Sequence, residues 1–183
     1  MSRPAVAPLR LEGALVYLRP VQPDDVKGGY GRWMNDPQVN QFLESRFHRF
    51  SEADLRAYVA KFQSDPGHVF LAVVARDTET HIGNVKLGPI DRHHGFADMG
   101  LLIGERAYWG RGIATEVISL VARYAFDELK LRKVTAGCYA TNRGAIKAFE
   151  KAGFVREGLR KKQYESNGEY VDHVMLGFLG PHE

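Results

Sequence analysis

The chain has 183 residues and a formal net charge of +3, with 44% hydrophobic and 26% charged residues. This length and composition predict an ordinary globular protein, most economically a single domain over residues 1–183 with its own core. The charge is too small and too scattered to indicate a nucleic-acid-binding protein, although it suits an anionic ligand. The single cysteine, Cys138, excludes an internal disulfide and fits a reducing compartment. Without a signal peptide or an apolar run of transmembrane length, we expect a cytoplasmic protein that does not bind membranes.

Strand and helix signals alternate in the first third of the chain. Residues 1–10 contain Pro and Ala without any period and predict a loose tail. Residues 14–19 predict a strand, and two aspartates in an N-cap position predict a helix over 25–34. A serine followed three residues later by an acid predicts a helix over 51–63. Residues 39–50 mix apolar and charged residues and give no clear prediction.

The rest of the chain predicts three antiparallel strands, a long helix, a strand, a helix and a closing hairpin. Asn167-Gly168 is the strongest short-range hairpin signal available. The predicted strands are residues 69–75, 81–87, 96–103, 133–139, 154–165 and 169–178, and the predicted helices are residues 115–129 and 142–152. This order indicates a mixed α/β fold with one central, mostly antiparallel sheet of about seven strands and helices on both faces.

A glycine turn precedes the long helix, with Gly110 and Gly112 two residues apart. Glycines let the backbone bend tightly and leave its N–H groups uncovered. The first turn of the following helix adds unpaired donors and the positive end of the helix dipole, which together favour a phosphate group. The pattern alone also fits a purely structural turn.

Two motifs in the right order carry a resemblance to a known family. The turn at residues 109–114 is similar to a pyrophosphate loop usually written Q/R-x-x-G-x-G/A. The second motif comprises Asn142, Ala145, Phe149, Glu150, Lys151, Gly153 and Phe154. With these motifs, the chain resembles the GNAT superfamily of acyl-CoA-dependent N-acetyltransferases over residues 12–178, and specifically its RimJ/RimL-like branch.

The resemblance implies acetyl-CoA as co-substrate and assigns residues to it. Backbone N–H groups of residues 111–115 would hold the pyrophosphate, and the backbone of residues 101–103 would run beside the pantetheine arm. Asn142 would reach the pantetheine or cap its helix, and Arg143 and Lys147 would meet the phosphates or only form a solvated helix face. The residues implied to bind the cofactor are Leu101, Leu102, Ile103, Trp109, Gly110, Arg111, Gly112, Ile113, Ala114, Thr115, Asn142, Phe149 and Lys151.

Two positions depart from the family pattern. Trp109 stands where the general motif has Gln or Arg. We expect this difference to have little effect on cofactor binding, because backbone N–H groups hold the pyrophosphate. Phe149 stands where many members have a tyrosine that protonates the leaving thiolate, and a phenyl ring cannot donate a proton. Water or a substrate group would then protonate coenzyme A, or the thiolate would leave unprotonated.

Transfer to an amine needs a base, usually a carboxylate. Asp98 is the first candidate because it precedes the glycine turn on a predicted strand, at a position that matches a glutamate in many RimL-like members. It also fits a charge on the exposed face of the sheet. Glu44 and Glu105 are lesser candidates, and we expect Glu105 to point to solvent. The seven histidines show no ligand spacing, so we expect no metal site.

The predicted function is transfer of an acetyl group to a primary amine of a small molecule, with a nucleotide-linked amino sugar favoured. The preference for this acceptor rests on a further resemblance to RimL-like enzymes that act on such sugars. Segments 33–37, 42–44 and 136–142 carry this resemblance. Side chains that could line an acceptor cleft are Trp33, Asn35, Phe42 and Phe47, and those that could meet a diphosphate are Arg156, Arg160, Lys161 and Lys162. The basic residues also fit a solvated strand edge.

Two other functions stay open. One is acetylation of protein N-termini, and the other is a catalytically silent sensor that binds acyl-CoA. Transfer through an acetylated Cys138 is a minor alternative to direct transfer. The resemblance also suggests a homodimer.

Overall fold

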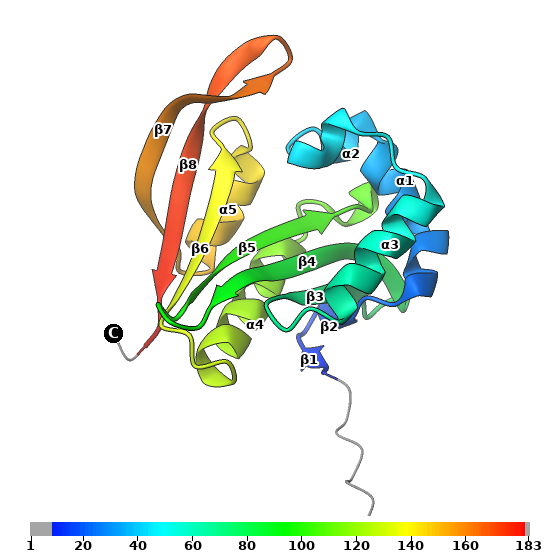
Figure 1. Ribbon diagram of the computed structural model, residues 1–183, viewed down its shortest axis with the longest axis horizontal. Helices are drawn as coiled ribbons and strands as arrows, with labels where there is room; N and C mark the ends of the chain where they lie inside the picture. The colour runs from blue at the N-terminus through cyan, green and yellow to red at the C-terminus, as the bar shows by residue number, and fades with distance from the viewer. Residues whose placement is uncertain (1–8, 182–183) are drawn as a thin grey trace, which may run out of the picture.

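The computed structural model describes residues 9–181. At its centre lies an eight-stranded sheet with the order β1-β2-β3-β4-β5-β6-β8-β7 (Figure 1). The strands are β1 (Leu11–Glu12), β2 (Val16–Pro20), β3 (Val69–Ala75), β4 (Thr80–Asp91), β5 (Phe96–Ile103), β6 (Lys133–Tyr139), β7 (Val155–Ser166) and β8 (Glu169–Leu179). Neighbouring strands are antiparallel except β5 and β6, which are parallel. The predicted mixed α/β fold with one mostly antiparallel sheet is confirmed.

Helices cover both faces of this sheet. They are α1 (Gly29–Asn35), α2 (Pro37–Asn40), α3 (Glu52–Gln63), α4 (Ile113–Asp127) and α5 (Arg143–Lys151), with short 3₁₀ turns at η1 (Pro23–Lys27), η2 (Glu44–Phe47) and η3 (Arg106–Tyr108). None of the helices in the described part of the chain is long and apolar enough to span a membrane.

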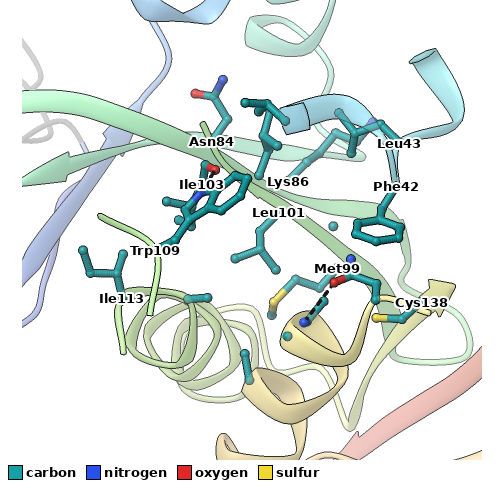
Figure 2. A pocket seen from close by; sticks show the side chains of 18 of the residues that line it. Phe42, Leu43, Asn84, Lys86, Met99, Leu101, Ile103, Trp109, Ile113 and Cys138 are labelled. Atoms are coloured by element: carbon teal, nitrogen blue, oxygen red, sulfur yellow. Dashed lines mark hydrogen bonds between the residues drawn. The ribbon is translucent and has the colours of Figure 1, made fainter. Parts of the chain in front are cut away.

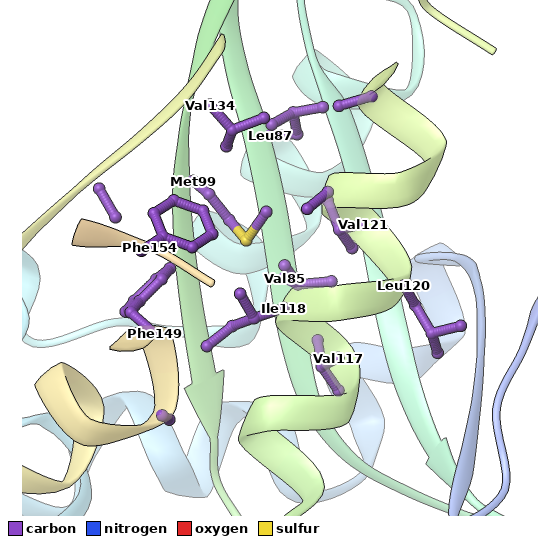
Figure 3. Close-up of a cluster of buried hydrophobic side chains, with 14 of the residues drawn as sticks. Val85, Leu87, Met99, Val117, Ile118, Leu120, Val121, Val134, Phe149 and Phe154 are labelled. Atoms are coloured by element: carbon purple, nitrogen blue, oxygen red, sulfur yellow. The ribbon is translucent and has the colours of Figure 1, made fainter. Parts of the chain in front are cut away.

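The two faces carry separate cores, as the alternation along β3 shows. Leu71 and Val73 belong to the larger core beneath α4 and α5, whereas Ala72 belongs to a second core with Trp33 of α1 and Val59 of α3. Figure 3 shows the larger core, in which α4 packs one apolar stripe against the sheet. The side chains labelled there are Val85, Leu87, Met99, Val117, Ile118, Leu120, Val121, Val134, Phe149 and Phe154.

Local signals in the sequence predicted the ends of several elements correctly. Ser51 caps α3 and forms a reciprocal capping box with Asp54. Asn142 caps α5, and its Oδ1 accepts a hydrogen bond from the backbone N–H of Ala145 at 3.2 Å. The hairpin β7–β8 turns at Asn167-Gly168, where both residues have positive φ, as the turn type requires.

Other boundaries were predicted wrongly. The helix expected over residues 25–34 is divided into η1 and α1, because Gly28 between them has a non-helical backbone conformation. Asp25 occupies the third position of η1 and not its N-cap. The long helix begins at Ile113 and ends at Asp127, two residues earlier than expected at both ends. Strand β4 extends to Asp91, and β1 adds an eighth strand by pairing with β2. The tail predicted over residues 1–10 falls mostly outside the described residues.

A wedge opens in the middle of the sheet. Strands β5 and β6 pair only at Phe96↔Lys133, Ala97↔Val134 and Asp98↔Thr135. Beyond Asp98, β5 continues to pair with β4 and β6 continues to pair with β8, so the two strands diverge (Figure 1). The edges of β5 and β6 that face each other across the wedge are therefore unpaired beyond this point.

Candidate active site

A cavity of about 800 Å³ occupies the wedge. This volume lies within the range of small-molecule and cofactor sites. Residues 99–103 of β5 form one wall, residues 137–139 of β6 face them, and the cavity extends to the N-terminal ends of α4 and α5. On the other face of the sheet it reaches side chains of α1, α3 and the segment 38–45. Figure 2 shows Met99 and Leu101 of β5, Cys138 of β6 and Phe42 around the cavity.

The N-terminus of α4 presents a cluster of free backbone donors at one end of the cavity. Gly110 and Gly112 adopt left-handed φ values of 76° and 82°. A Cβ at either position would meet nothing within 4 Å, so the backbone conformation and not crowding calls for glycine there. Gly112 caps α4 without a side-chain hydrogen bond, and the N–H groups of residues 111–115 have no partner among the described residues. Such a helix end attracts an anion.

Trp109 fixes this loop to the end of β5. Its indole Nε1 donates a hydrogen bond to the backbone carbonyl of Ile103 at 2.7 Å (Figure 2). The ring lies at the mouth of the cavity and is 44% exposed. The side chain of Arg111, by contrast, turns away from the cavity and stacks over the Tyr108 ring, 5.0 Å from its centroid. Arg111 is not among the residues that line the cavity, although its backbone N–H belongs to the turn that leads into α4.

Asp98 lies at the closed end of the wedge. It is the last residue of β5 that pairs with β6, and its Oδ1 accepts a hydrogen bond from Thr135 Oγ1 at 2.9 Å. Asp98 is an exposed residue and is not among the residues that line the cavity. Desolvation by the neighbouring protein nevertheless raises the pKa of its carboxyl group, and the Thr135 hydroxyl and the Lys86 charge offset part of that rise. A raised pKa makes a carboxylate a stronger base at neutral pH.

Comparison with known proteins identifies the chain. A family profile described as an acetyltransferase (GNAT) domain matches residues 16–155. The chain is 33% identical over 180 residues to the probable N-acetyltransferase YjcK of Bacillus subtilis (strain 168), covering 93% of this chain and 97% of that protein. The chain belongs to the GNAT acetyltransferase family. It is therefore an acyltransferase, and the predicted resemblance is confirmed at the level of the family, while the RimJ/RimL branch stays a prediction.

Two further matches differ in the acceptors that their names state. An L-amino acid N-acetyltransferase, AaaT of Escherichia coli (strain K12), is 28% identical over 106 residues, which is 58% of this chain and 56% of that protein. The structure of spermidine N-acetyltransferase from Vibrio cholerae in complex with CoA and spermine superposes with a TM-score of 0.82 at 24% identity, covering 91% of this chain and 96% of that chain. The second match establishes the shared fold alone.

The residues predicted to bind the cofactor lie together along the cavity wall, apart from Arg111. Those that line it are Leu101, Leu102, Ile103, Trp109, Gly110, Gly112, Ile113, Ala114, Thr115, Asn142, Phe149 and Lys151. Phe149 is 2% exposed and packs edge-on against Phe154. That these residues hold the cofactor stays a prediction.

Cys138 also lines the cavity, but its chemistry is unsuited to acyl transfer. Burial raises the pKa of its thiol to about 12. The thiolate is the nucleophilic form of cysteine, so Cys138 remains an unreactive thiol at neutral pH.

Glu105 does not point to solvent as predicted. Its carboxylate accepts a hydrogen bond from Trp33 Nε1 at 2.9 Å and a second one from Arg32. Trp33 in turn packs so closely over Gly104 that a Cβ there would lie 2.0 Å from the indole. Glu105 therefore ties α1 to the chain that follows β5.

Glu44 joins a different network, at the mouth of the wedge. The phenol of Tyr139 donates to the Glu44 carboxylate, and Arg46 Nη1 donates to the same phenol oxygen at 2.8 Å. Arg46 also donates to the backbone carbonyl of Glu165 at 2.6 Å. Burial, together with the hydrogen bond to Glu44, raises the pKa of Tyr139. This network holds the segment 43–47 against the C-terminal hairpin.

The prediction of which residues line the acceptor cleft is only partly right. Phe42 lines the cavity, whereas Trp33 is buried in the second core. Asn35 bonds to backbone groups of residues 31 and 50, and Phe47 is 62% exposed outside the described wall. Sequence reasoning also missed two polar wall residues, Asn84 and Lys86, although both alternate with apolar neighbours in a predicted strand.

No three His, Cys, Asp or Glu side chains within residues 9–181 are grouped as metal ligands.

Proposed function

We propose that this GNAT protein transfers the acetyl group of acetyl-CoA directly to a primary amine of a small molecule. The observation that supports the proposal is the position of one cavity between the free edge of β5 and the unpaired N–H groups of residues 111–115. An elongated ligand with an anionic diphosphate at one end and amide groups along its length suits such a groove. Coenzyme A has this chemistry.

The roles of the residues follow from their positions. The N–H groups at the start of α4 would hold the pyrophosphate, and alternate backbone groups of residues 99–103 would pair with the pantetheine amides. Asp98 would accept the proton of the attacking amine, directly or through one water. Phe149 would pack against the cofactor and donate no proton, so the departing thiolate would be protonated by water or by the acceptor. Direct transfer suits the protonated Cys138 thiol.

The identity of the acceptor has less support than the reaction. The basic residues expected to meet the diphosphate of a nucleotide-linked amino sugar lie on β7, outside the described wall of the cavity. Arg156 pairs with Glu150 at 2.8 Å and Lys161 with Asp172 at 3.1 Å. The β7 residues therefore give an amino-sugar nucleotide no support, and the proposal covers small-molecule amines as a class.

Two measurements test the proposal. Calorimetry should show that acetyl-CoA binds with one site per chain, and absence of binding would overturn the cofactor assignment. Thiol release should then be followed with amino acids, free and nucleotide-linked amino sugars, polyamines and peptides with free N-termini. Turnover on a small-molecule class supports the proposal. Turnover only on peptides would indicate an N-terminal acetyltransferase, and binding without turnover on any amine would indicate a silent sensor.

A further inference from the structure

Lys86 is a half-buried cation in the acceptor half of the cavity. Its Nζ donates a hydrogen bond to the Tyr58 hydroxyl at 2.9 Å and lies 4.5 Å from the centroid of the Phe62 ring. No carboxylate of residues 9–181 lies within ion-pair distance of this ammonium group. Because lysines are seldom withdrawn from solvent without an anionic partner, this position suits a ligand that brings its own negative charge.

The charged residues around the cavity support the same conclusion. Within the described chain, the charged side chains that line it are Lys86, Lys147 and Lys151, and none of the lining residues is Asp or Glu. The two lysines of α5 lie on the side of the cavity assigned to the cofactor. Lys86 lies opposite Gly100 on the face shared with Asp98. A polycation such as a polyamine would meet repulsion from these three lysines, because the nearby carboxylates of Asp98 and Glu44 are not among the residues that line the cavity.

Two further donors lie near Lys86. Asn84 precedes it by two residues on the same face of β4, and its side chain lines the cavity while the residue is only 5% exposed. Asn84 Oδ1 lies 2.8 Å from His81 Nε2, which also lies 2.9 Å from the backbone carbonyl of Gly83. Because a carbonyl oxygen can only accept, Nε2 carries the proton and donates to these oxygens. That arrangement leaves Asn84 Nδ2 as a buried donor without a partner among the described residues. Tyr30 of α1 also lines the cavity.

The space between Lys86 and Asp98 is compact. Lys86 pairs directly with Gly100, and Asp98 lies two residues before Gly100, so the two charged residues are diagonal neighbours on one face. The Cα atoms of diagonal neighbours on adjacent strands lie roughly 7–8 Å apart. A Cβ at Gly100 would meet nothing within 4 Å, so the sheet is open to a ligand at this point. The opposite charges suit a small molecule that carries an amine and an anion a few bonds apart.

We propose that Lys86, with Asn84 beside it, binds the carboxylate of the acceptor and that the acceptor is an α-amino acid or a similarly compact amino acid. The amine of this acceptor lies toward Asp98 and its carboxylate lies on the Lys86 ammonium group. This assignment rests on the proposed acetyltransferase function and adds the class of its acceptor. It makes Lys86 a specificity-determining residue with no part in binding acetyl-CoA.

Matched acceptors test the carboxylate directly. A set of α-amino acids is compared with the corresponding primary amides and decarboxylated amines, with kcat/KM expressed per neutral amine. The wild-type protein should prefer the carboxylate form by about tenfold or more, because a charge-assisted hydrogen bond at a half-buried site contributes that much. Equal use of all three forms, or a preference for polyamines, would overturn the assignment while leaving the acetyltransferase function intact.

The variants Lys86→Met and Lys61→Met separate the role of this residue from general charge effects. Lys61 lies on the exposed surface of α3 and contacts the same Phe62 ring, 5.4 Å from its centroid. Lys86→Met should bring the carboxylate-to-amide ratio close to one with an unchanged KM for acetyl-CoA, and Lys61→Met should keep the wild-type ratio. An equal loss with both acceptor forms in Lys86→Met would contradict the proposal.

Binding measurements keep the inference testable if no amine is turned over. Calorimetry with CoA already bound compares an amino acid with its amide. Binding of the amino acid by the wild-type protein and not by Lys86→Met would support the carboxylate site even though the proposed function had failed. Failure of both compounds to bind would overturn the site.

Discussion

Replacing Gly112 by alanine should weaken acetyl-CoA binding through the backbone alone. Gly112 has φ near 82°, and a Cβ there would meet no atom within 4 Å, so the substitution introduces strain without a clash. A left-handed conformation costs a non-glycine residue about 1–2 kcal/mol. If the turn relaxes to avoid this cost and one N–H group loses its phosphate contact, the loss is about 1.5–3 kcal/mol, or roughly 10- to 100-fold in Kd.

Gly168→Ala is the matched control. Gly168 has φ near 83° and equally open surroundings, but it lies in the β7–β8 turn outside the described cavity wall. Both variants should lose a few degrees in Tm, since about 1 kcal/mol shifts the Tm of a chain of this size by roughly 2–4 °C. Calorimetry should show weakened acetyl-CoA binding in Gly112→Ala only. Equal affinities in the two variants would refute the assignment of the pyrophosphate to residues 111–115.

Three other substitutions test separate parts of the site. Asp98→Asn should lower kcat/KM by about 10²- to 10⁴-fold with little change in acetyl-CoA binding. Because burial raises the pKa of Asp98, the wild-type rate should fall as the pH drops through that raised pKa, and a surviving acidic limb in Asp98→Asn would exclude Asp98 as the base. Cys138→Ala should keep most of its activity, and mass spectrometry should find no acetylated Cys138 in the wild-type protein; detection of that adduct would contradict direct transfer. Trp33→Phe removes the indole donor to Glu105 and should lower the free energy of unfolding by about 1–3 kcal/mol in urea titrations, whereas an unchanged midpoint would show that this hydrogen bond adds no stability.

Several signals confined to neighbouring residues were read correctly from the sequence. Asn167-Gly168 predicted the hairpin and Ser51 predicted the start of α3, because turn and cap conformations depend on only a few residues. The glycine turn before α4 predicted an N-terminal anion site, which stays a prediction. In the described part of the chain, the N–H groups of residues 111–115 have no hydrogen-bond partner.

Features that depend on tertiary pairing were not accessible in this way. The two-residue strand β1 exists only because β2 pairs with it. Glu105 was expected in solvent because nothing near it in sequence indicates Trp33, which precedes it by 72 residues. Lys86 likewise donates a hydrogen bond to Tyr58 of α3, which precedes it by 28 residues in the sequence. Periodicity shows which face of an element is apolar, but not which distant side chain completes a polar contact.

The wedge between β5 and β6 also bears on self-association. Unpaired strand edges are templates on which other chains add strands and aggregate, and most proteins shorten, charge or cover such edges. Here the free edges of β5 and β6 face one another across a concave opening, with helices above and below the sheet (Figure 1). A strand of another folded protein would have to enter with its side chains and its neighbouring strands, whereas a single thin chain with amide groups needs far less room. The concavity of the fold thus keeps a hydrogen-bonding strand edge available to a slender ligand and closed to neighbouring proteins.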